Sequence, residues 1–215
     1  MLRFFQPHSN FSMANIAVVY YSSTGSTYRV AQAIEAGASA AGANVRLRKV
    51  QELASPQTVS SKPAWSVHLE ETRDIPEASA ADMEWADGYA FGSPTRFGLP
   101  AAQLKQFIDT LGPSWAASKL QDKAACAFTG AGNPHGGQES TLLAMQNMFF
   151  HWGAVLVPPG YTDPSVKAAG GNPYGTSFTA KADGSVSESV LAAARHQGRR
   201  IAMVAAALAV LRGSA

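Results

Sequence analysis

Three times along this chain, an apolar run leads into a loop of glycine and small polar residues, and apolar residues at helical spacing follow. The runs cover 16–21, 88–91 and 123–128. Continuous apolar runs of this length are typical of parallel strands that helices cover on both faces. Two further strands are expected at 45–50 and 154–157, and a last helix at 187–211. The alternation predicts an α/β fold, a doubly wound five-stranded parallel sheet with helices on both faces.

The loops that follow the three apolar runs are expected to form one site. All strands of a parallel sheet end at the same edge, and ligands bind beyond those carboxyl ends. The loops cover 22–27, 92–99 and 129–139. Their convergence is the strongest indication of a binding site that the residues themselves give.

The first loop has the composition of a phosphate site. It joins a strand to a helix N-terminus, where free N–H groups and the helix dipole attract anions. It contains no Lys or Arg and matches neither the Walker nor the Rossmann pattern. Neutral groups would therefore hold the phosphate, namely Ser22, Ser23, Thr24, Gly25, Ser26 and Thr27. Ordinary capping of the helix by Ser and Thr is the alternative.

The second and third loops have features suited to a flat heterocycle. Pro94 and Gly98 fix a bend that can offer backbone N–H groups, and Arg96 can offset negative charge on a reduced ring. A surface turn with Phe97 packed beneath it is the alternative. The third loop, T-G-A-G-N-P-H-G-G-Q-E at 129–139, has enough glycine for the backbone to approach a ligand closely. Its alternative is a floppy connection.

Charge and cysteine content exclude several classes of protein. The net charge is +2 and Lys and Arg are scattered, so a nucleic-acid partner is not expected. Cys126 is the single cysteine and lies in an apolar run, which fits a buried strand thiol and a reducing, cytoplasmic location. The dispersed histidines give no metal pattern, and no nucleophile elbow is present. No apolar run reaches the roughly 18 residues that would predict insertion in a membrane.

The chain is expected to form one domain over residues 13–215. Residues 1–12 have no signal-peptide pattern and precede Met13, so we interpret them as a disordered extension or a misassigned start. Residues 51–80 are interpreted as a surface insertion, too polar for a second core, with a short helix at 78–85. Residues 160–185 are rich in Gly and Pro and are expected to be loop.

Six stretches together resemble the WrbA family of flavodoxin-like NAD(P)H:quinone oxidoreductases. They are Y-Y-S-S-T-G-S-T (20–27), G-S-P-T-R-F-G (92–98), L-G-P-S-W (111–115), T-G-A-G…G-G-Q-E (129–139), H-W-G-A-V-L-V-P-P-G-Y (151–161) and G-G-N-P-Y-G (170–175). The resemblance extends from about Asn15 to Arg212. The second and fourth stretches are its most specific motifs, whereas the first is shared by flavodoxins in general.

The resemblance implies a noncovalently bound FMN and assigns residues to it. Residues 22–27 would hold the phosphate. The isoalloxazine would be bordered by Pro94, Thr95, Arg96, Phe97 and Gly98 on one side, and by Thr129, Gly130, Ala131, Gly132, Gly136 and Gly137 on the other. Trp115 matches a tryptophan of the substrate pocket, and His151 matches a flavin contact that often comes from a neighbouring subunit. The chain departs from the family pattern at three places. Relatives often have Tyr at the position of Thr24, residues 133–135 are an insertion, and Trp152 replaces a second His.

The activity implied is two-electron reduction of quinones by NADH or NADPH, with hydride passing through flavin N5 in a ping-pong cycle. A homo-oligomer is expected, by resemblance a tetramer. Its exposed aromatic residues would be Trp115, Phe149, Phe150, Trp152 and Tyr174. Trp115, Tyr174 and also His151, which lies between Phe150 and Trp152, would reach a flavin held by another chain. An electron-carrying flavodoxin or a redox-sensing flavoprotein is the alternative, although flavodoxins are typically acidic and lack the second and third loop motifs.

Overall fold

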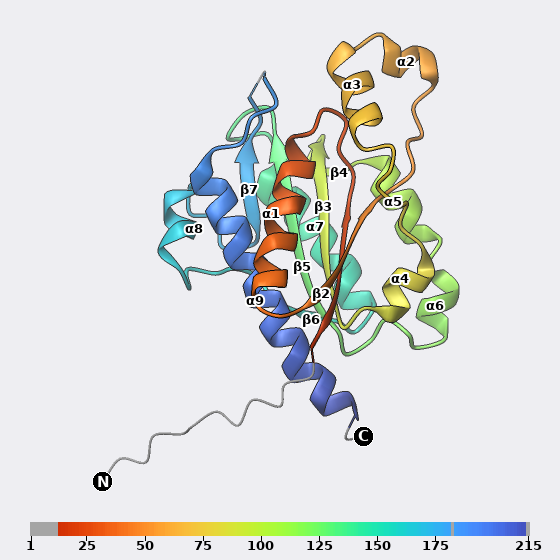
Figure 1. Ribbon diagram of the computed structural model, residues 1–215, viewed down its shortest axis with the longest axis vertical. Coiled ribbons are helices and arrows are strands. Elements are labelled where there is room, and N and C mark those ends of the chain that lie inside the picture. Colours follow the sequence, from red (N-terminus) through yellow and green to blue (C-terminus); the bar gives the residue numbers. More distant parts are fainter. Residues whose placement is uncertain (1–12, 182, 214–215) are drawn as a thin grey trace.

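The computed structural model describes residues 13–181 and 183–213, and the expectation for residues 1–12 lies outside them. The described chain forms one sheet between two layers of helices (Figure 1). The main path of the sheet is β2 (Asn44–Lys49), β1 (Asn15–Tyr20), β3 (Gly88–Arg96), β5 (Ala124–Ala131) and β6 (Val155–Leu156), all parallel. The predicted parallel α/β architecture of five strands is confirmed along this path.

Two short strands extend the sheet beyond the prediction. Strand β4 (Leu99–Pro100) pairs antiparallel with the end of β3. Strand β7 (Thr176–Thr179) pairs with the second half of β5, while β6 pairs with its first residues, so β6 and β7 share one position in the sheet. The expectation that 160–185 is entirely loop was wrong, because this segment also contains α8 (Pro164–Ala168). The four residues of β7, T-S-F-T, are too few to show an alternating apolar pattern, and the strand is held by its pairing with β5.

Each face of the sheet has its own apolar core. Side chains alternate along a strand, so Ile16, Val18 and Tyr20 face α1 (Ser26–Ala40) and α9 (Glu188–Gly213). Ala17, Val19 and Tyr21 face the opposite layer. That layer contains α4 (Ala80–Trp85), α5 (Ala102–Asp109), α6 (Gly112–Ala116) and α7 (Gln138–His151). Its core also buries Phe149 and Trp152, which pack on Phe91 with ring centroids 5.5 and 5.8 Å away, so these two are not exposed as the sequence suggested.

Helices α1 and α9 approach each other through glycine. A Cβ added to Gly37 would lie 2.0 Å from the Arg195 carbonyl oxygen, and one added to Gly198 would lie 2.0 Å from the Ile34 carbonyl oxygen. No side chain can occupy either position without separating the helices. Because α1 begins at the first loop, this contact also fixes where the N-terminus of α1 lies.

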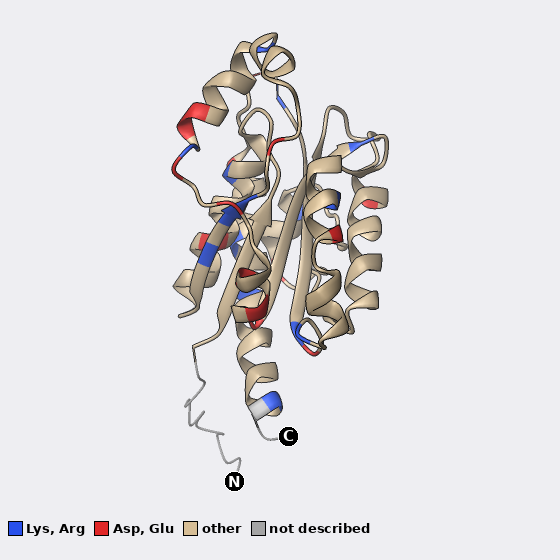
Figure 2. Cartoon of the chain, turned by 90° about the vertical axis from the view of Figure 1, so that its right-hand side faces the viewer, with Lys and Arg blue, Asp and Glu red and all other residues tan. Residues whose placement is uncertain are grey.

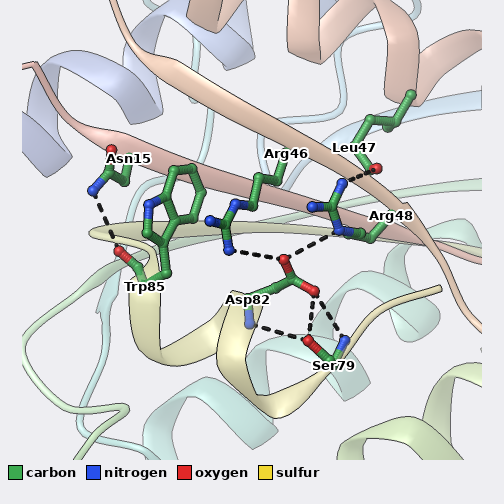
Figure 3. Close-up of polar contacts among 7 residues, drawn as sticks. All are labelled: Asn15, Arg46, Leu47, Arg48, Ser79, Asp82 and Trp85. Carbon is green, nitrogen blue, oxygen red and sulfur yellow. Dashed lines mark hydrogen bonds and ion pairs between the residues drawn. The ribbon is translucent and has the colours of Figure 1, made fainter. Parts of the chain in front are cut away.

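The edge strand β2 is tied to α4 by buried charge (Figure 3). Arg46 and Arg48 each lie 3.1 Å from Asp82 Oδ1, and the Arg46 guanidinium stacks 3.9 Å from the Trp85 ring centroid. Asp82 also closes a capping box with Ser79. Burial by itself would raise the pKa of Asp82, but the bonds from Ser79 and the two arginines hold that pKa below its usual value. The basic side chains of β2 thus join this edge strand to α4 on one face of the sheet.

The 51–80 excursion is more ordered than its composition suggested. It forms α2 (Pro56–Ser60) and α3 (Pro63–Glu71), and Trp65 of α3 is buried in the core. Trp65 Nε1 and the Tyr21 hydroxyl both donate to Glu52 Oε2, each at 3.0 Å. The excursion is therefore anchored directly beside the end of β1.

Candidate functional site

The three predicted loops meet around one cavity at the carboxyl edge of the sheet. The cavity has a volume of about 260 Å³. Its lining residues come from all three loops and from β7: Ser22, Ser23, Thr24, Ser26, Thr27, Pro94, Thr95, Arg96, Gly130, Ala131, Gly132, Phe178 and Ala180. Hydroxyl groups and backbone dominate this list, Arg96 is its one cation, and it contains no carboxylate. The cavity therefore suits an anionic ligand with a flat apolar part.

The first loop presents the N-terminus of α1 to this cavity. Gly25 is the N-cap, with φ +96°, and its N–H donates to Ser22 Oγ at 3.1 Å. The first turn of α1 contains no acidic residue. Thr27 is buried and its hydroxyl has no hydrogen-bond partner among the described residues, whereas Ser26 Oγ donates to the Gly184 carbonyl. An oxyanion would meet the helix dipole, backbone N–H groups and the Thr27 hydroxyl here.

The second loop is a β-hairpin held in place by hydroxyl groups. Strand β3 continues to Arg96 and turns through Phe97, whose φ is +55° and whose side chain is fully exposed. The alternative in which Phe97 packs beneath the turn is therefore excluded. Ser93 Oγ accepts a bond from the Ala101 N–H at 2.8 Å, and Thr95 Oγ1 lies 2.7 Å from Thr141 Oγ1 of α7. The first bond closes the hairpin and the second fixes it against α7.

The third loop begins as strand rather than as a floppy connection. Strand β5 continues to Ala131, and Thr129 Oγ1 donates to the Ser93 carbonyl at 2.7 Å. A Cβ on Gly130 would lie 2.3 Å from the Phe178 ring, so only glycine allows β7 to close this side of the cavity. Phe178 and Ala180 are lining residues that the sequence did not indicate. The one signal was the isolated aromatic residue of T-S-F-T after Gly175, which is too short to identify a strand.

Several predicted residues shape the cavity without lining it. Gly25, Phe97 and Thr129 are chain neighbours of lining residues, whereas Gly98, Gly136 and Gly137 lie further along the second and third loops. Gly137 has φ +91° and begins α7, and a Cβ there would lie 2.8 Å from Gly98 Cα. The backbones of the second and third loops therefore meet at this point.

Trp115 and His151 lie away from this cavity. Trp115 is on α6 and 53% exposed, and its Nε1 donates to the His151 carbonyl at 2.8 Å. His151 is the last residue of α7, whose 14 residues rise 1.5 Å each. His151 is therefore about 20 Å along the helix axis from the third loop. Neither residue lines the cavity formed by its own chain.

His68 of α3 packs against the first loop beside Gly25 and Tyr28. A Cβ on Gly25 would lie 3.5 Å from His68 Nδ1, and the His68 ring lies 5.6 Å from that of Tyr28 on α1. His68 is buried and Nδ1 has no hydrogen-bond partner among the described residues. Burial lowers the pKa of His68 and keeps the ring neutral. Sequence reasoning missed this residue because it lies in the polar excursion, far from the three loops along the chain.

Four other features of the described chain concern its cysteine, its possible metal ligands, its helices and its surface charge. Cys126 is a free buried thiol, and burial raises its pKa to about 12. Among the described residues, no three His, Cys, Asp or Glu side chains gather as metal ligands would. None of the helices in residues 13–181 and 183–213 is long and apolar enough to cross a membrane. On the face that Figure 2 shows, Lys and Arg are interspersed with Asp and Glu.

The model of the NADPH-dependent FMN reductase family matches residues 14–165, which span the first, second and third loops. The chain belongs to this family. Within the FMN reductase family its similarity to WrbA-like proteins, inferred above from six motifs, is confirmed by curated and solved relatives.

Two curated relatives are each named NAD(P)H dehydrogenase (quinone). The protein of Deinococcus radiodurans is 48% identical over 185 residues, which cover 86% of this chain and 92% of that protein. The protein of Azorhizobium caulinodans is 39% identical and covers 91% of this chain and 99% of its own length. A solved flavodoxin, the WrbA-like protein from Agrobacterium tumefaciens, superposes with a TM-score of 0.64 at 27% identity, over 89% of this chain and 97% of its own. An archaeal flavodoxin, 17% identical with a TM-score of 0.59, shares the fold.

The residues around the cavity fit the FMN that this FMN reductase family implies. The N-terminus of α1 and the Thr27 hydroxyl match a phosphate, and the glycine backbone at 130–132 leaves room for a flat ring beside Phe178. Arg96 Nη2 lies 3.5 Å from Ser23 Oγ, which places its charge between the first and second loops. A cation there, with no carboxylate in the lining, favours a negatively charged cofactor.

Proposed function

We propose that this protein is an NAD(P)H dehydrogenase (quinone) that binds FMN at the carboxyl edge of its sheet. The observation that carries this is the cavity shared by the three loops, which has neutral donors, one arginine and no carboxylate in its lining. The name of the two curated relatives, which match this chain over most of their length, supports the substrate class.

The chain's own groups would bind and orient the cofactor. Backbone N–H groups of residues 24, 26 and 27 and the Thr27 hydroxyl would hold the phosphate, while the Gly25 N–H donates to Ser22 Oγ. The hairpin at 94–98 and the segment 129–132 would border the ring on two sides, and Arg96 would stabilise negative charge on the reduced form. Bound FMN would supply the two-electron chemistry, accepting hydride from NADH or NADPH and delivering it to a quinone.

A single cavity predicts the order of events. The nicotinamide and the quinone would occupy the same space in turn, which gives ping-pong kinetics. The fully exposed ring of Phe97 lies next to Arg96 at the rim of the cavity. An aromatic face there would give either substrate a surface on which to stack.

Trp115 and His151 would act on the flavin of another subunit. Both are exposed, and a hydrogen bond holds Trp115 of α6 beside His151 at the end of α7, so neither reaches the cavity of its own chain. A closed homo-oligomer, by family resemblance a tetramer, would bring them to a neighbouring site. Trp115 would then line the quinone pocket, and His151 would donate a hydrogen bond. The single buried Cys126 favours the reducing cytoplasm as the place of action.

Cofactor release and steady-state kinetics test this proposal. Denatured protein should release FMN that co-elutes with an authentic standard. NADH or NADPH should bleach the yellow protein, and a soluble quinone should restore the colour with parallel double-reciprocal plots. Released FAD would contradict the cofactor assignment. Tightly bound FMN without quinone turnover would instead favour a flavodoxin-type electron carrier.

A further inference from the structure

A second groove lies beside the cofactor cavity and is open to solvent. Its volume is about 450 Å³. We call it the lateral groove. Its main features are the start of α7 at Gln138 and Glu139, the exposed rings of Tyr161 and Tyr174, and Asn172 and Phe178.

The lateral groove and the cofactor cavity are two sides of the same wall. Phe178 lines both of them. Along β7, Ser177 and Thr179 face the lateral groove, while Ala180 lines the cavity. The third loop divides in the same way, because residues 130–132 line the cavity and Pro134, Gln138 and Glu139 line the groove. A molecule longer than the cavity would have to pass over the end of β7 at Phe178 to reach the groove.

The walls of the groove suit an aromatic base. Tyr161 is 61% exposed and Tyr174 is 43% exposed, and neither ring stacks on another ring of the described chain. The backbone of Tyr174 is fixed from both sides, since its N–H donates to Asn172 Oδ1 at 3.1 Å and its carbonyl accepts from Gln146 Nε2 at 2.8 Å. Exposed rings on a fixed backbone are stacking surfaces that cost little ordering entropy when a planar ligand binds.

The polar groups of the groove select among nucleotides. Gln138 and Asn172 provide neutral amides; Gln138 Nε2 donates to Thr179 Oγ1 and Asn172 Nδ2 to Ser177 Oγ, which leaves each amide one further N–H for a phosphate oxygen. Glu139 is the one charged side chain in the lining, and the lining contains no Lys or Arg. A carboxylate accepts hydrogen bonds from an unmodified ribose 2′-hydroxyl, whereas a 2′-phosphate would be repelled by it and would find no cation in the groove.

We propose that the lateral groove binds the adenosine half of NADH, and that Glu139 makes the enzyme prefer NADH to NADPH. This inference rests on the proposed function, because it assumes that a nicotinamide enters the adjoining cavity. It assigns the adenine to the rings of Tyr161 and Tyr174, and the ribose to Glu139.

The first test measures binding without turnover. FMN-loaded protein is titrated with AMP and with adenosine 2′,5′-bisphosphate, neither of which can reduce a flavin. Wild type should bind AMP about tenfold more tightly, because the second phosphate meets Glu139. Glu139→Gln should bring the two affinities to within about threefold. Glu188→Gln, the first-turn glutamate of α9, is the matched control and should keep the wild-type ratio.

The second test compares NADH with reduced nicotinamide mononucleotide, which lacks the adenosine. Tyr174→Leu should lower kcat/KM for NADH relative to the mononucleotide about tenfold, the usual effect of removing one stacking partner. Absence of AMP binding, or an unchanged nucleotide ratio in Glu139→Gln, would overturn the inference. If none of the reduced nicotinamides bleaches the flavin, the proposed function fails, and the AMP titration still decides whether the groove binds adenosine.

Discussion

Thr27 offers the sharpest residue-scale test of the phosphate site. Thr27 is a buried residue at the start of α1 that lines the cavity, and its hydroxyl makes no hydrogen bond to the described residues, so a bound phosphate would supply one. Thr27→Ala should weaken FMN binding by about 2–13-fold, the equivalent of one neutral hydrogen bond. Thr27→Ser keeps the hydroxyl and should bind within about twofold of wild type. Fluorescence quenching on titration of the apoprotein with FMN gives both values.

Gly25→Val should be the more damaging change in the same loop. The backbone at Gly25 has φ +96°, which a β-branched residue adopts only with strain, and its added Cβ would contact the His68 ring. We expect FMN affinity to fall by more than tenfold, since the N–H groups of the loop would turn away from the phosphate. If both Thr27→Ala and Gly25→Val bind FMN as tightly as wild type, the phosphate binds elsewhere.

The buried imidazole of His68 makes stability depend on pH. Its pKa in the folded protein is lowered by burial, below the unfolded value of about 6.5. The unfolded state therefore binds the proton more strongly, and stability is lost as pH falls through about 6.5 toward the folded pKa. His68→Phe keeps a ring beside Tyr28 and should reduce the fall in Tm between pH 7.5 and 5.5. His196, whose pKa is also lowered by burial, should account for the dependence that remains. His135→Asn, a change in an exposed loop, should leave the wild-type fall in Tm.

At the scale of elements, the contact between α1 and α9 should tolerate no added methyl group. Gly198→Ala would place a Cβ 2.0 Å from a backbone carbonyl, which cannot rotate away as a side chain can. Overpacking of this kind costs about 1–3 kcal/mol, and a backbone neighbour favours the upper end. Gly112→Ala is the control, because a Cβ there meets nothing within 4 Å. Urea unfolding should separate the two variants, and equal midpoints would show that the helices can move apart.

The elements also show where sequence reasoning succeeds and fails. Strands β1, β3 and β5 were predictable because each is a continuous apolar run, and the loops after them follow from the parallel topology. Strand β7 was missed because its stability comes from pairing with β5 rather than from its own four residues. Helix α3 was missed for a related reason. Its Trp65 and His68 are buried by contacts with distant residues, such as Glu52 and Tyr28. The sequence of the helix shows no continuous apolar face from which a helix could be predicted.

At the scale of the whole molecule, several exposed apolar side chains lie on elements that the proposed oligomer would cover. Phe150, which precedes His151 in the chain, and Val155 of β6 are both exposed. Phe97, Leu99 and Leu143 are exposed at the hairpin and along α7. Exposed apolar groups of this size on several adjoining elements are uncommon on monomers. The family resemblance already predicted that Trp115 and His151 act on a neighbour's flavin, and the length of α7, which separates His151 from the third loop, supports that prediction.

Assembly should therefore be required for cofactor binding and turnover. Phe150→Arg places a charge in the proposed interface without touching the chain's own cavity, so it should weaken the oligomer while leaving the fold intact. On dilution, light scattering should show this variant dissociating at higher concentration than wild type, with FMN release and loss of quinone reduction at the same concentration. Val67→Arg, an exposed position on α3, should behave as wild type. A monomer that keeps FMN and full activity would contradict both the oligomer and the assignment of Trp115 and His151 to a neighbour's site.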